Sequence, residues 1–123
     1  MTSDVGDRRR ALGSAGEDTA AAWYEAAGYE LLDRNWRCRE GEIDLVVARP
    51  GVVVFCEVKT RRGDAFGLPA EAVTRDKQLR IRRLAIRWLT ERGARAPSVR
   101  FDVASVRKEP GRAPDIEVLE GAF

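Results

Sequence analysis

Three carboxylates and a lysine interrupt the otherwise apolar stretch GEIDLVVARPGVVVFCEVKT. They are Glu42, Asp44, Glu57 and Lys59. Carboxylate oxygens are the ligands that Mg²⁺ and Mn²⁺ prefer, and a bound ion can lower the pKa of water and neutralise charge on a phosphoryl group. A lysine beside the ion can position or deprotonate the water, or stabilise charge in the transition state. This set of residue types suits phosphodiester hydrolysis.

The same stretch predicts a β-hairpin with a Pro-Gly turn, and the hairpin brings these charges together. With a two-residue turn, Asp44 lies opposite Glu57 and Glu42 lies opposite Lys59. Side chains alternate between the faces of a strand, so all four are expected on one face. Facing carboxylates repel each other, and a divalent cation between them reverses the sign of that interaction. A bulge would shift the pairing of Asp44 with Glu57 but would keep Glu57 and Lys59 on a shared face.

The alternative interpretation is that these are solvated or ion-paired surface charges. Glu42 and Lys59 would then be an ordinary cross-strand ion pair, which contributes little to stability. Glu57 and Lys59 end the continuous apolar run VVVFCEVK, where solvated charge is less expected. Their position therefore favours the functional interpretation.

The composition limits the chemistry available. The chain has no histidine, which excludes a Ser-His-Asp triad, and its two cysteines cannot complete a zinc site. We expect both cysteines to be reduced thiols, with Cys56 in the core. No glycine-rich nucleotide-binding loop is present. Acid–base work near neutral pH must therefore use carboxylates, lysine, a tuned cysteine or metal-bound water.

Length and charge indicate one domain with a slightly basic character. The chain has 123 residues, 44% of them apolar and 34% charged, with a net charge of +2. This length suits a single domain, which we expect over residues 13–123, preceded by a loose basic arm at residues 1–12. No signal peptide or membrane span is visible, so we expect a cytoplasmic protein. The basic excess permits nucleic-acid binding without requiring it.

The periodicity of the chain predicts an α/β fold with a mixed sheet flanked by helices. We expect a helix over residues 14–27, a strand over 29–37, the hairpin, a helix ending near residue 92, a strand over 99–106 and a short edge strand around 116–118. The early strands are expected to be antiparallel, and the strand–helix–strand unit from 52 to 106 is expected to be parallel.

The ends and apolar faces of the two expected helices can be read from particular residues. Thr74 is expected to cap the second helix and Gly93 to end it. Its expected apolar stripe is Ile81, Leu84, Ala85 and Trp88, and that of the first helix is Ala20, Trp23, Tyr24 and Ala27. Ser14 and Glu17 have the spacing of a capping box. Glu17 therefore has a structural interpretation that stays open at this point.

The ordered motifs of the chain resemble those of a known family. An Asp, a strand turn and Glu-x-Lys, within the order helix–three strands–helix–strand, resemble the PD-(D/E)xK restriction-endonuclease-like fold. More closely, the segments GEDTAAAWYEAAGYELLDRNWR, GEIDLVV, VVFCEVKTR, FGLPAEAV, KQLRIRRLA and RFDV are similar to the YraN family of predicted nucleases. That family has been likened to archaeal Holliday-junction resolvases. The resemblance covers residues 12–106 and the final Ala-Phe, and it implies an αβββαβ core.

The resemblance also implies roles for particular residues. It assigns Asp44 and Glu57 as metal ligands, Lys59 as the catalytic lysine, and Glu17 as a further acidic member of the site and metal ligand. Glu42 belongs to the GEID motif, where ligation and solvation both remain open. Ile43 stands where the superfamily name has proline, which is not a ligand. The tail DIEVLEGAF lacks the histidines that many relatives show.

Basic residues near the hairpin and on the second helix are the expected contacts for a phosphate backbone. They are Arg61, Arg62, Lys77, Arg80, Arg83 and Arg87. A solvated helix face is the alternative for the stripe on the helix. Trp36 and Phe66 could stack on bases, although aromatic residues that flank strands usually pack in the core.

Together these features lead to the expectation of an Mg²⁺- or Mn²⁺-dependent endonuclease acting on branched DNA. The main rival is a non-catalytic nucleic-acid-binding module that retains the endonuclease fold. A protein-interaction domain with a coincidental acidic hairpin is a third interpretation. A homodimer is compatible with the resemblance, because junction resolvases cut paired strands as two-fold dimers.

Overall fold

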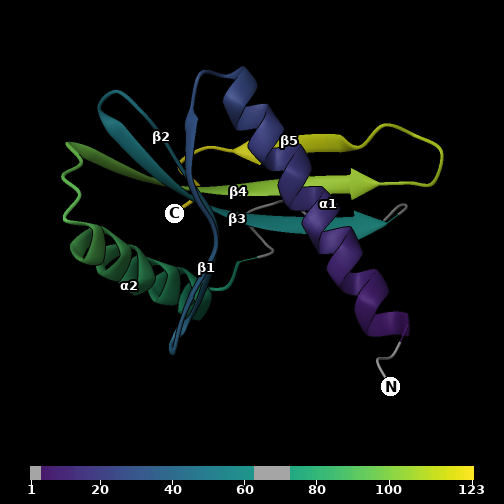
Figure 1. Ribbon diagram of the computed structural model, residues 1–123, viewed down its shortest axis with the longest axis horizontal. Helices are drawn as coiled ribbons and strands as arrows, with labels where there is room; N and C mark the ends of the chain where they lie inside the picture. The colour runs from purple at the N-terminus through teal and green to yellow at the C-terminus, as the bar shows by residue number, and fades with distance from the viewer. Residues whose placement is uncertain (1–3, 63–72) are drawn as a thin grey trace.

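The computed structural model describes the backbone of residues 4–62 and 73–123, and the side chains of residues 11–62 and 73–123. Two helices and five strands follow one another along the chain (Figure 1). They are α1 (Asp4–Ala26), β1 (Glu30–Cys38), β2 (Gly41–Arg49), β3 (Val52–Arg62), α2 (Arg75–Arg92), β4 (Ser98–Lys108) and β5 (Asp115–Leu119). This is the predicted element order.

The five strands form one mixed sheet in the order β1-β2-β3-β4-β5. Strands β3 and β4 pair in parallel, and the other neighbours pair antiparallel. The predicted α/β class with an αβββαβ core is confirmed, and β5 is the predicted short edge strand. The parallel strands β3 and β4 are joined along the chain through α2, and β3 is the central strand of the sheet.

The two helices cover opposite faces of the sheet, each over its own apolar cluster. Under α2, Phe55 lies among buried residues that include Trp88 and Phe101. Under α1, Tyr24 packs in a cluster with Leu45 and other residues of the central strands. Central strands buried on both faces read as continuous apolar runs, which explains VVVFC in β3.

Helix α2 has the predicted boundaries and buried face. The Thr74 side chain accepts a hydrogen bond from the Lys77 backbone N–H, and Gly93 adopts a left-handed conformation with φ of 59°. Its buried residues are Ile81, Leu84, Ala85 and Trp88, as predicted. The N-cap fixes the first turn, and Lys77 belongs to that turn.

Helix α1 begins at Asp4, so residues 4–12 are helical where the sequence predicted a loose arm. Arginine, alanine and leucine in this segment are good helix formers, which accounts for the extension. Ser14 therefore lies inside the helix instead of at its N-cap, and the capping-box interpretation of Ser14 with Glu17 is wrong. The predicted stripe holds for Ala20 and Tyr24, which are fully buried, whereas Ala27 is exposed beyond the helix end.

Gly16 sets the distance between α1 and β3. A methyl group built at this glycine would lie 1.8 Å from the Thr60 hydroxyl oxygen, closer than atoms can approach. Nothing lies within 4 Å of the corresponding position at Gly13. The helix can approach the strand this closely only with glycine at position 16, and this approach carries the next residue, Glu17, toward the hairpin.

We therefore expect opposite effects from two alanine substitutions in the same helix. Gly16→Ala should lower the free energy of unfolding by about 1–3 kcal/mol through overpacking. Gly13→Ala should raise it by up to about 1 kcal/mol, because alanine is the better helix former and meets no neighbour. Urea denaturation measures both values. Equal effects from the two variants would contradict the close packing of α1 against Thr60.

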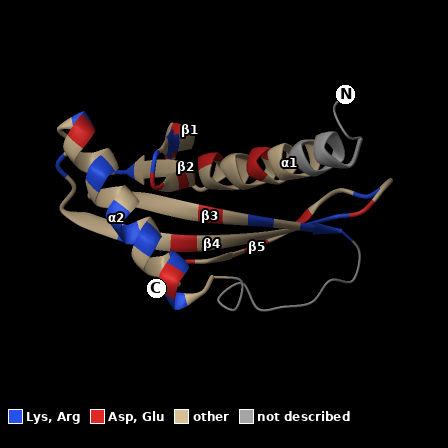
Figure 2. Cartoon of the chain, turned by 90° about the horizontal axis from the view of Figure 1, so that it is seen from below, with Lys and Arg blue, Asp and Glu red and all other residues tan. Residues whose placement is uncertain are grey.

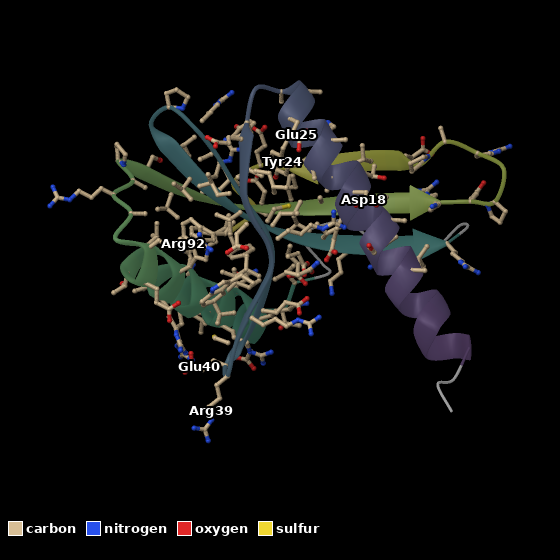
Figure 3. The ribbon with its side chains drawn as sticks, in the orientation of Figure 1. Asp18, Tyr24, Glu25, Arg39, Glu40 and Arg92 are labelled. Atoms are coloured by element: carbon tan, nitrogen blue, oxygen red, sulfur yellow. The ribbon has the colours of Figure 1, made fainter. Side chains whose placement is uncertain are left out.

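A buried carboxylate ties α1, β4 and the C-terminal tail together. The Asp102 side chain is fully buried, accepts a hydrogen bond from the Tyr24 hydroxyl at 2.6 Å, and forms two hydrogen bonds of 2.9 Å with Arg100. The backbone N–H of Gly121 donates to it at 3.0 Å. Figure 3 shows Tyr24 on α1 near this part of the sheet. Burial and the neighbouring acidic groups raise the pKa of Tyr24 well above its usual range, so it remains a donor.

The C-terminus is also fixed by aromatic packing. The ring of Phe123 stacks on that of Phe101 with centroids 5.2 Å apart, and the Arg82 guanidinium lies 4.7 Å from the Phe101 centroid. The backbone N–H of Ala122 donates to the Phe101 carbonyl. The final Ala-Phe pair thus has a structural role in covering the sheet. Within the described residues, no helix is long and apolar enough to cross a membrane.

Candidate active site

The β2–β3 hairpin has the predicted register as far as Leu45. Arg49 pairs with Val52, and the pairing continues to Leu45 opposite Cys56. The ladder then ends, one residue short of the expected pair of Asp44 and Glu57. The prediction that Glu42 faces Lys59 in this ladder is wrong, because Glu42 lies beyond the point where the two strands stop pairing.

The strands part at Asp44, whose carboxylate replaces the missing ladder contact. Its Oδ2 atom accepts a hydrogen bond of 2.8 Å from the Val58 backbone N–H. Leu45 packs under α1, whereas Ile43 packs under α2, so the alternation of β2 is interrupted between them. A partly buried N–H needs a partner, and the aspartate supplies one.

An irregularity in β1 accompanies this break. Asn35 lies between the residues that pair with Ile43 and Leu45, and its φ is 54°, a conformation that asparagine tolerates better than most residues. Its side-chain amide donates a hydrogen bond to Glu17 Oε1 at 3.1 Å. The strained position in β1 therefore orients an acidic residue of α1.

Carboxylates from α1 and β2 meet where the strands separate. One oxygen each from Glu17, Glu42 and Asp44 lie within 4.8 Å of one another. Glu17 is additionally held by Arg34 at 3.6 Å, and Glu42 by Arg37 at 2.7 Å. The structure thus places Glu17 next to Asp44, as the site interpretation of that residue requires.

Glu57 is buried beside this group and is held by two lysines. Its Oε1 atom lies 2.5 Å from Lys77 Nζ and 3.5 Å from Lys59 Nζ. Lys59 comes from the same face of β3, whereas Lys77 comes from the capped first turn of α2. The sequence predicted Lys77 only as a phosphate contact, so its place among the carboxylates is a new finding. No spacing rule connects it to the hairpin.

The electrostatics of the site follow from burial and from the crowded charges. Burial and the nearby Glu57 carboxylate raise the pKa of Asp44 from 3.8 to about 8, although the Val58 hydrogen bond works in the opposite direction. Contact with Lys77, together with burial, lowers the pKa of Lys59 below its usual value. Burial opposes the charge on Lys77, but the contact with Glu57 raises its pKa overall. Without a cation, the crowded carboxylates therefore disfavour the ionised form of Asp44.

A cavity of about 200 Å³ opens onto these groups. Its walls include Glu42, Asp44, Glu57, Lys77 and Arg80. Such a volume holds several waters at roughly 30 Å³ each. An octahedral Mg²⁺ ion binds oxygen at about 2.0–2.1 Å and keeps several waters, so the donor set and the space both fit this ion or Mn²⁺.

The predicted basic residues are divided among several places. Lys77 and Arg80 line the cavity, and Arg83 is exposed on α2. Arg87 pairs with Glu91 on the same helix and with Glu40 at the β1–β2 turn. Figure 3 shows Glu40 at this turn, next to α2. Figure 2 shows the basic positions spaced along α2 and a second basic group where β3 and β4 end. Arg61 and Arg62 belong to this second group.

The two predicted aromatic contacts have different outcomes. Trp36 is partly buried and packs against the cluster under α2, so the core interpretation holds for it. Phe66 lies outside the described residues. Cys56 is buried in the core, as predicted, and Cys38 is a free thiol near the end of β1.

The raised pKa of Asp44 predicts a pH dependence of stability in the metal-free protein. A carboxyl with a higher pKa in the folded state binds more protons there, so stability falls as pH rises from about 4 to about 8. Asp44→Asn keeps an oxygen for Val58 but cannot ionise. Over this range, wild type should lose on the order of a few kcal/mol relative to the variant, measured by urea denaturation in chelator. Parallel stability curves would show that Asp44 ionises normally.

The fold and the site together define an α/β chain with a restriction-endonuclease-like core and an acidic centre at the split between β2 and β3. The chain belongs to the uncharacterised protein family UPF0102, whose model matches residues 16–106. This is the YraN family that the motifs indicated. The match includes α1 from Gly16, the hairpin, α2 and most of β4.

Curated relatives match over nearly their whole length. A UPF0102 protein of Nocardia farcinica (strain IFM 10152) is 51% identical over 119 residues, which cover 97% of this chain and 93% of the relative. One of Rhodococcus jostii (strain RHA1) is 52% identical over 113 residues, 92% of this chain and 96% of the relative. One of Frankia alni is 54% identical over 113 residues, which cover 92% of this chain and 94% of the relative.

Proposed function

We propose that this protein is an Mg²⁺- or Mn²⁺-dependent endonuclease that hydrolyses phosphodiester bonds in branched DNA. The observation that supports it most is that carboxylates from three elements converge on Asp44: Glu17 lies close to it, and Glu57 lines the same cavity, with Lys59 beside Glu57. Burying like charges together costs free energy, so a merely structural role does not account for the arrangement.

Each residue has a defined task in this proposal. Asp44, Glu57 and Glu17 would hold the ion, and Asn35 and the Val58 N–H would orient two of those carboxylates. The ion, when bound, would lower the pKa of a water and neutralise charge on the phosphoryl group. Lys59 would position that water or stabilise the charge that develops during hydrolysis. Water would reach the ion through the cavity that Arg80 lines.

Branched DNA is the preferred substrate class because the family whose motifs this chain shares has been likened to junction resolvases. A cleavage panel tests this proposal with labelled four-way junctions, flaps, duplexes, single strands and RNA, each with Mg²⁺, with Mn²⁺ or with chelator. We expect metal-dependent cutting of at least one branched DNA by wild type and none by Asp44→Asn. Absence of cleavage across the whole panel would reject the enzymatic function.

A non-catalytic nucleic-acid-binding module is the second candidate, and one observation favours it. Lys77 already neutralises Glu57 at 2.5 Å, which would be the resting arrangement in a site that never holds metal. Calorimetric titration with Mn²⁺ separates the two candidates. The enzyme requires Mn²⁺ binding that Asp44→Asn abolishes. Nucleic-acid binding without any Mn²⁺ site would identify the module.

A further inference from the structure

A second group of basic residues lies where the parallel strands β3 and β4 end. The strand register places Arg61 beside Arg107 and Arg62 beside Lys108. Neighbouring strands are about 4.8 Å apart, so these side chains start close together. Like charges at neighbouring positions such as Arg62 and Lys108 are unfavourable unless an anion lies between them. Figure 2 shows the basic positions meeting at this end of the sheet.

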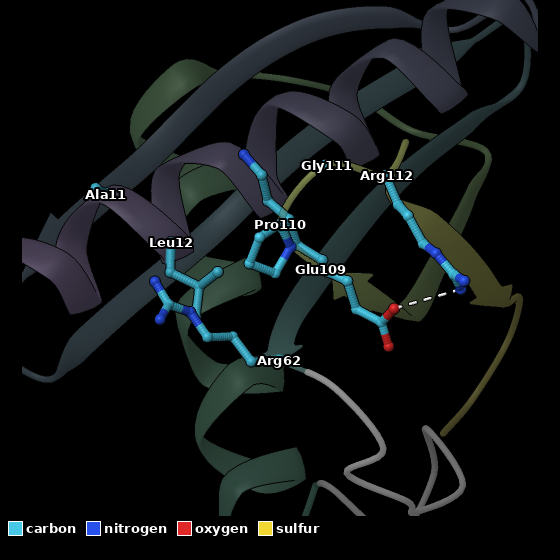
Figure 4. A pocket seen from close by; sticks show the side chains of 8 residues that line it. Ala11, Leu12, Arg62, Glu109, Pro110, Gly111 and Arg112 are labelled. Atoms are coloured by element: carbon cyan, nitrogen blue, oxygen red, sulfur yellow. Dashed lines mark ion pairs between the residues drawn. The ribbon is translucent and has the colours of Figure 1, made fainter.

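A cavity of about 420 Å³ opens at Arg62 and Lys108. Ala11 and Leu12 of α1 contribute its apolar wall, and the β4–β5 loop contributes Glu109 and Arg112 (Figure 4). Glu109 is the one acidic residue among the described residues that line it, and it pairs with Arg112 at 3.5 Å. The described part of the chain contains no ion pair to Arg62 or Lys108. The cavity therefore has a net positive charge.

The position of this cavity relates it to the acidic site. Thr60 faces α1, where it meets Gly16, so alternation places Arg62 on the same side of the sheet. Arg62 is three residues beyond Lys59, which corresponds to about 10 Å along the strand, and alternation places the two side chains on opposite faces of the sheet. A nucleic-acid backbone that contacts both residues would therefore pass around the end of β3.

We propose that Arg62, Lys108 and Arg112 form a second phosphate-binding site that holds the nucleic-acid backbone on the α1 side of the sheet, away from the bond to be cut. This inference rests on the proposed function, since it assigns the path of the substrate away from the acidic site. Arginine suits this task because its planar fork binds phosphate oxygens in pairs. The open end of the cavity, at the edge of the molecule, accommodates a continuing strand better than an isolated small anion.

Single alanine variants of Arg62 and Lys108 test the proposal, with Arg95→Ala as the matched control. Arg95 is exposed and precedes β4, at the opposite end of that strand from Lys108, and each variant removes one positive charge. Affinity for a fluorescent 20-base-pair duplex is measured in chelator over a range of salt concentrations. Removing one phosphate contact should reduce the slope of log K against log salt by about 0.9 and weaken binding roughly 5–10-fold at 0.1 M salt. Arg95→Ala should leave the slope unchanged.

Two results would overturn the proposal. One is an unchanged slope in both cavity variants. The other is an equal loss of affinity and slope in Arg95→Ala, which would mean that the effect comes from net charge alone. Vesicles containing phosphatidylserine serve as a second probe: if Lys108→Ala weakens vesicle binding but not duplex binding, the partner is a lipid surface instead.

The assay also separates this proposal from the proposed function, because it needs no metal and no cleavage. Slope changes in a protein that cuts nothing would support the binding site and reject the enzyme. Cleavage by wild type with unchanged slopes in both variants would reject the binding site alone.

Discussion

The Lys59→Ala protein is expected to cleave branched DNA at least about 10²–10³ times more slowly than wild type, while it still binds DNA and Mn²⁺. Lys59 Nζ lies 3.5 Å from Glu57 on the same face of β3, close enough to act on a water or on the phosphoryl group. The residue ligates no metal in this account, so its loss should affect the rate of chemistry more than binding. Single-turnover cleavage at saturating enzyme measures that rate.

Lys77→Ala is the matched control, because it removes a second lysine from the same carboxylate. Lys77 lies nearer to Glu57 than Lys59 does, but it comes from α2 and its contact with Glu57 raises its pKa. We expect a smaller loss of rate from this variant. A severe loss in Lys77→Ala with near-normal cleavage in Lys59→Ala would assign the catalytic lysine to α2 and contradict the account.

The Asp102→Ala protein is expected to lose about 3–5 kcal/mol of folding free energy, enough to unfold many single domains. The substitution leaves the Arg100 charge and the Tyr24 hydroxyl without their buried partner, and it frees the Gly121 N–H. It also loosens the contact of α1 with β4. Urea denaturation followed by circular dichroism measures the loss.

Asp18→Ala is the control for the removal of an acidic residue. Asp18 also forms an ion pair, with Arg34, but its side chain is 66% exposed. Exposed pairs contribute little, so this variant should lie within about 1 kcal/mol of wild type. A loss of less than 1 kcal/mol in Asp102→Ala would mean that the buried network does not stabilise the fold.

Much of the fold was predictable because its signals are local. The N-cap at Thr74, the left-handed Gly93 and the apolar stripe of α2 depend on residues within a few turns of each other. The Pro-Gly turn likewise set the register of β2 and β3 as far as Leu45. The start of α1 was missed because Ser14 and Glu17 have the spacing of a capping box although the helix continues through them.

The residues of the candidate site could be named from the sequence, but their geometry could not. The hairpin pattern and the family motifs pointed to Asp44, Glu57 and Lys59, and the resemblance added Glu17. The break in β2 at Asp44 and the positive φ of Asn35 arise from packing between strands, which no local pattern encodes. Lys77 joins Glu57 only because α2 crosses the sheet at that point. Such contacts between distant segments require the three-dimensional structure.

The most direct test of the central claim is a crystal of the protein grown with Mn²⁺ and measured for anomalous scattering. One strong peak is expected in the cavity, about 2.1 Å from oxygens of Asp44 and Glu57 and within reach of Glu17. The same crystal would show Lys77 moved away from the Glu57 oxygen that it contacts without metal. A crystal at millimolar Mn²⁺ with no peak at Asp44 would contradict the claim that these carboxylates form a metal centre.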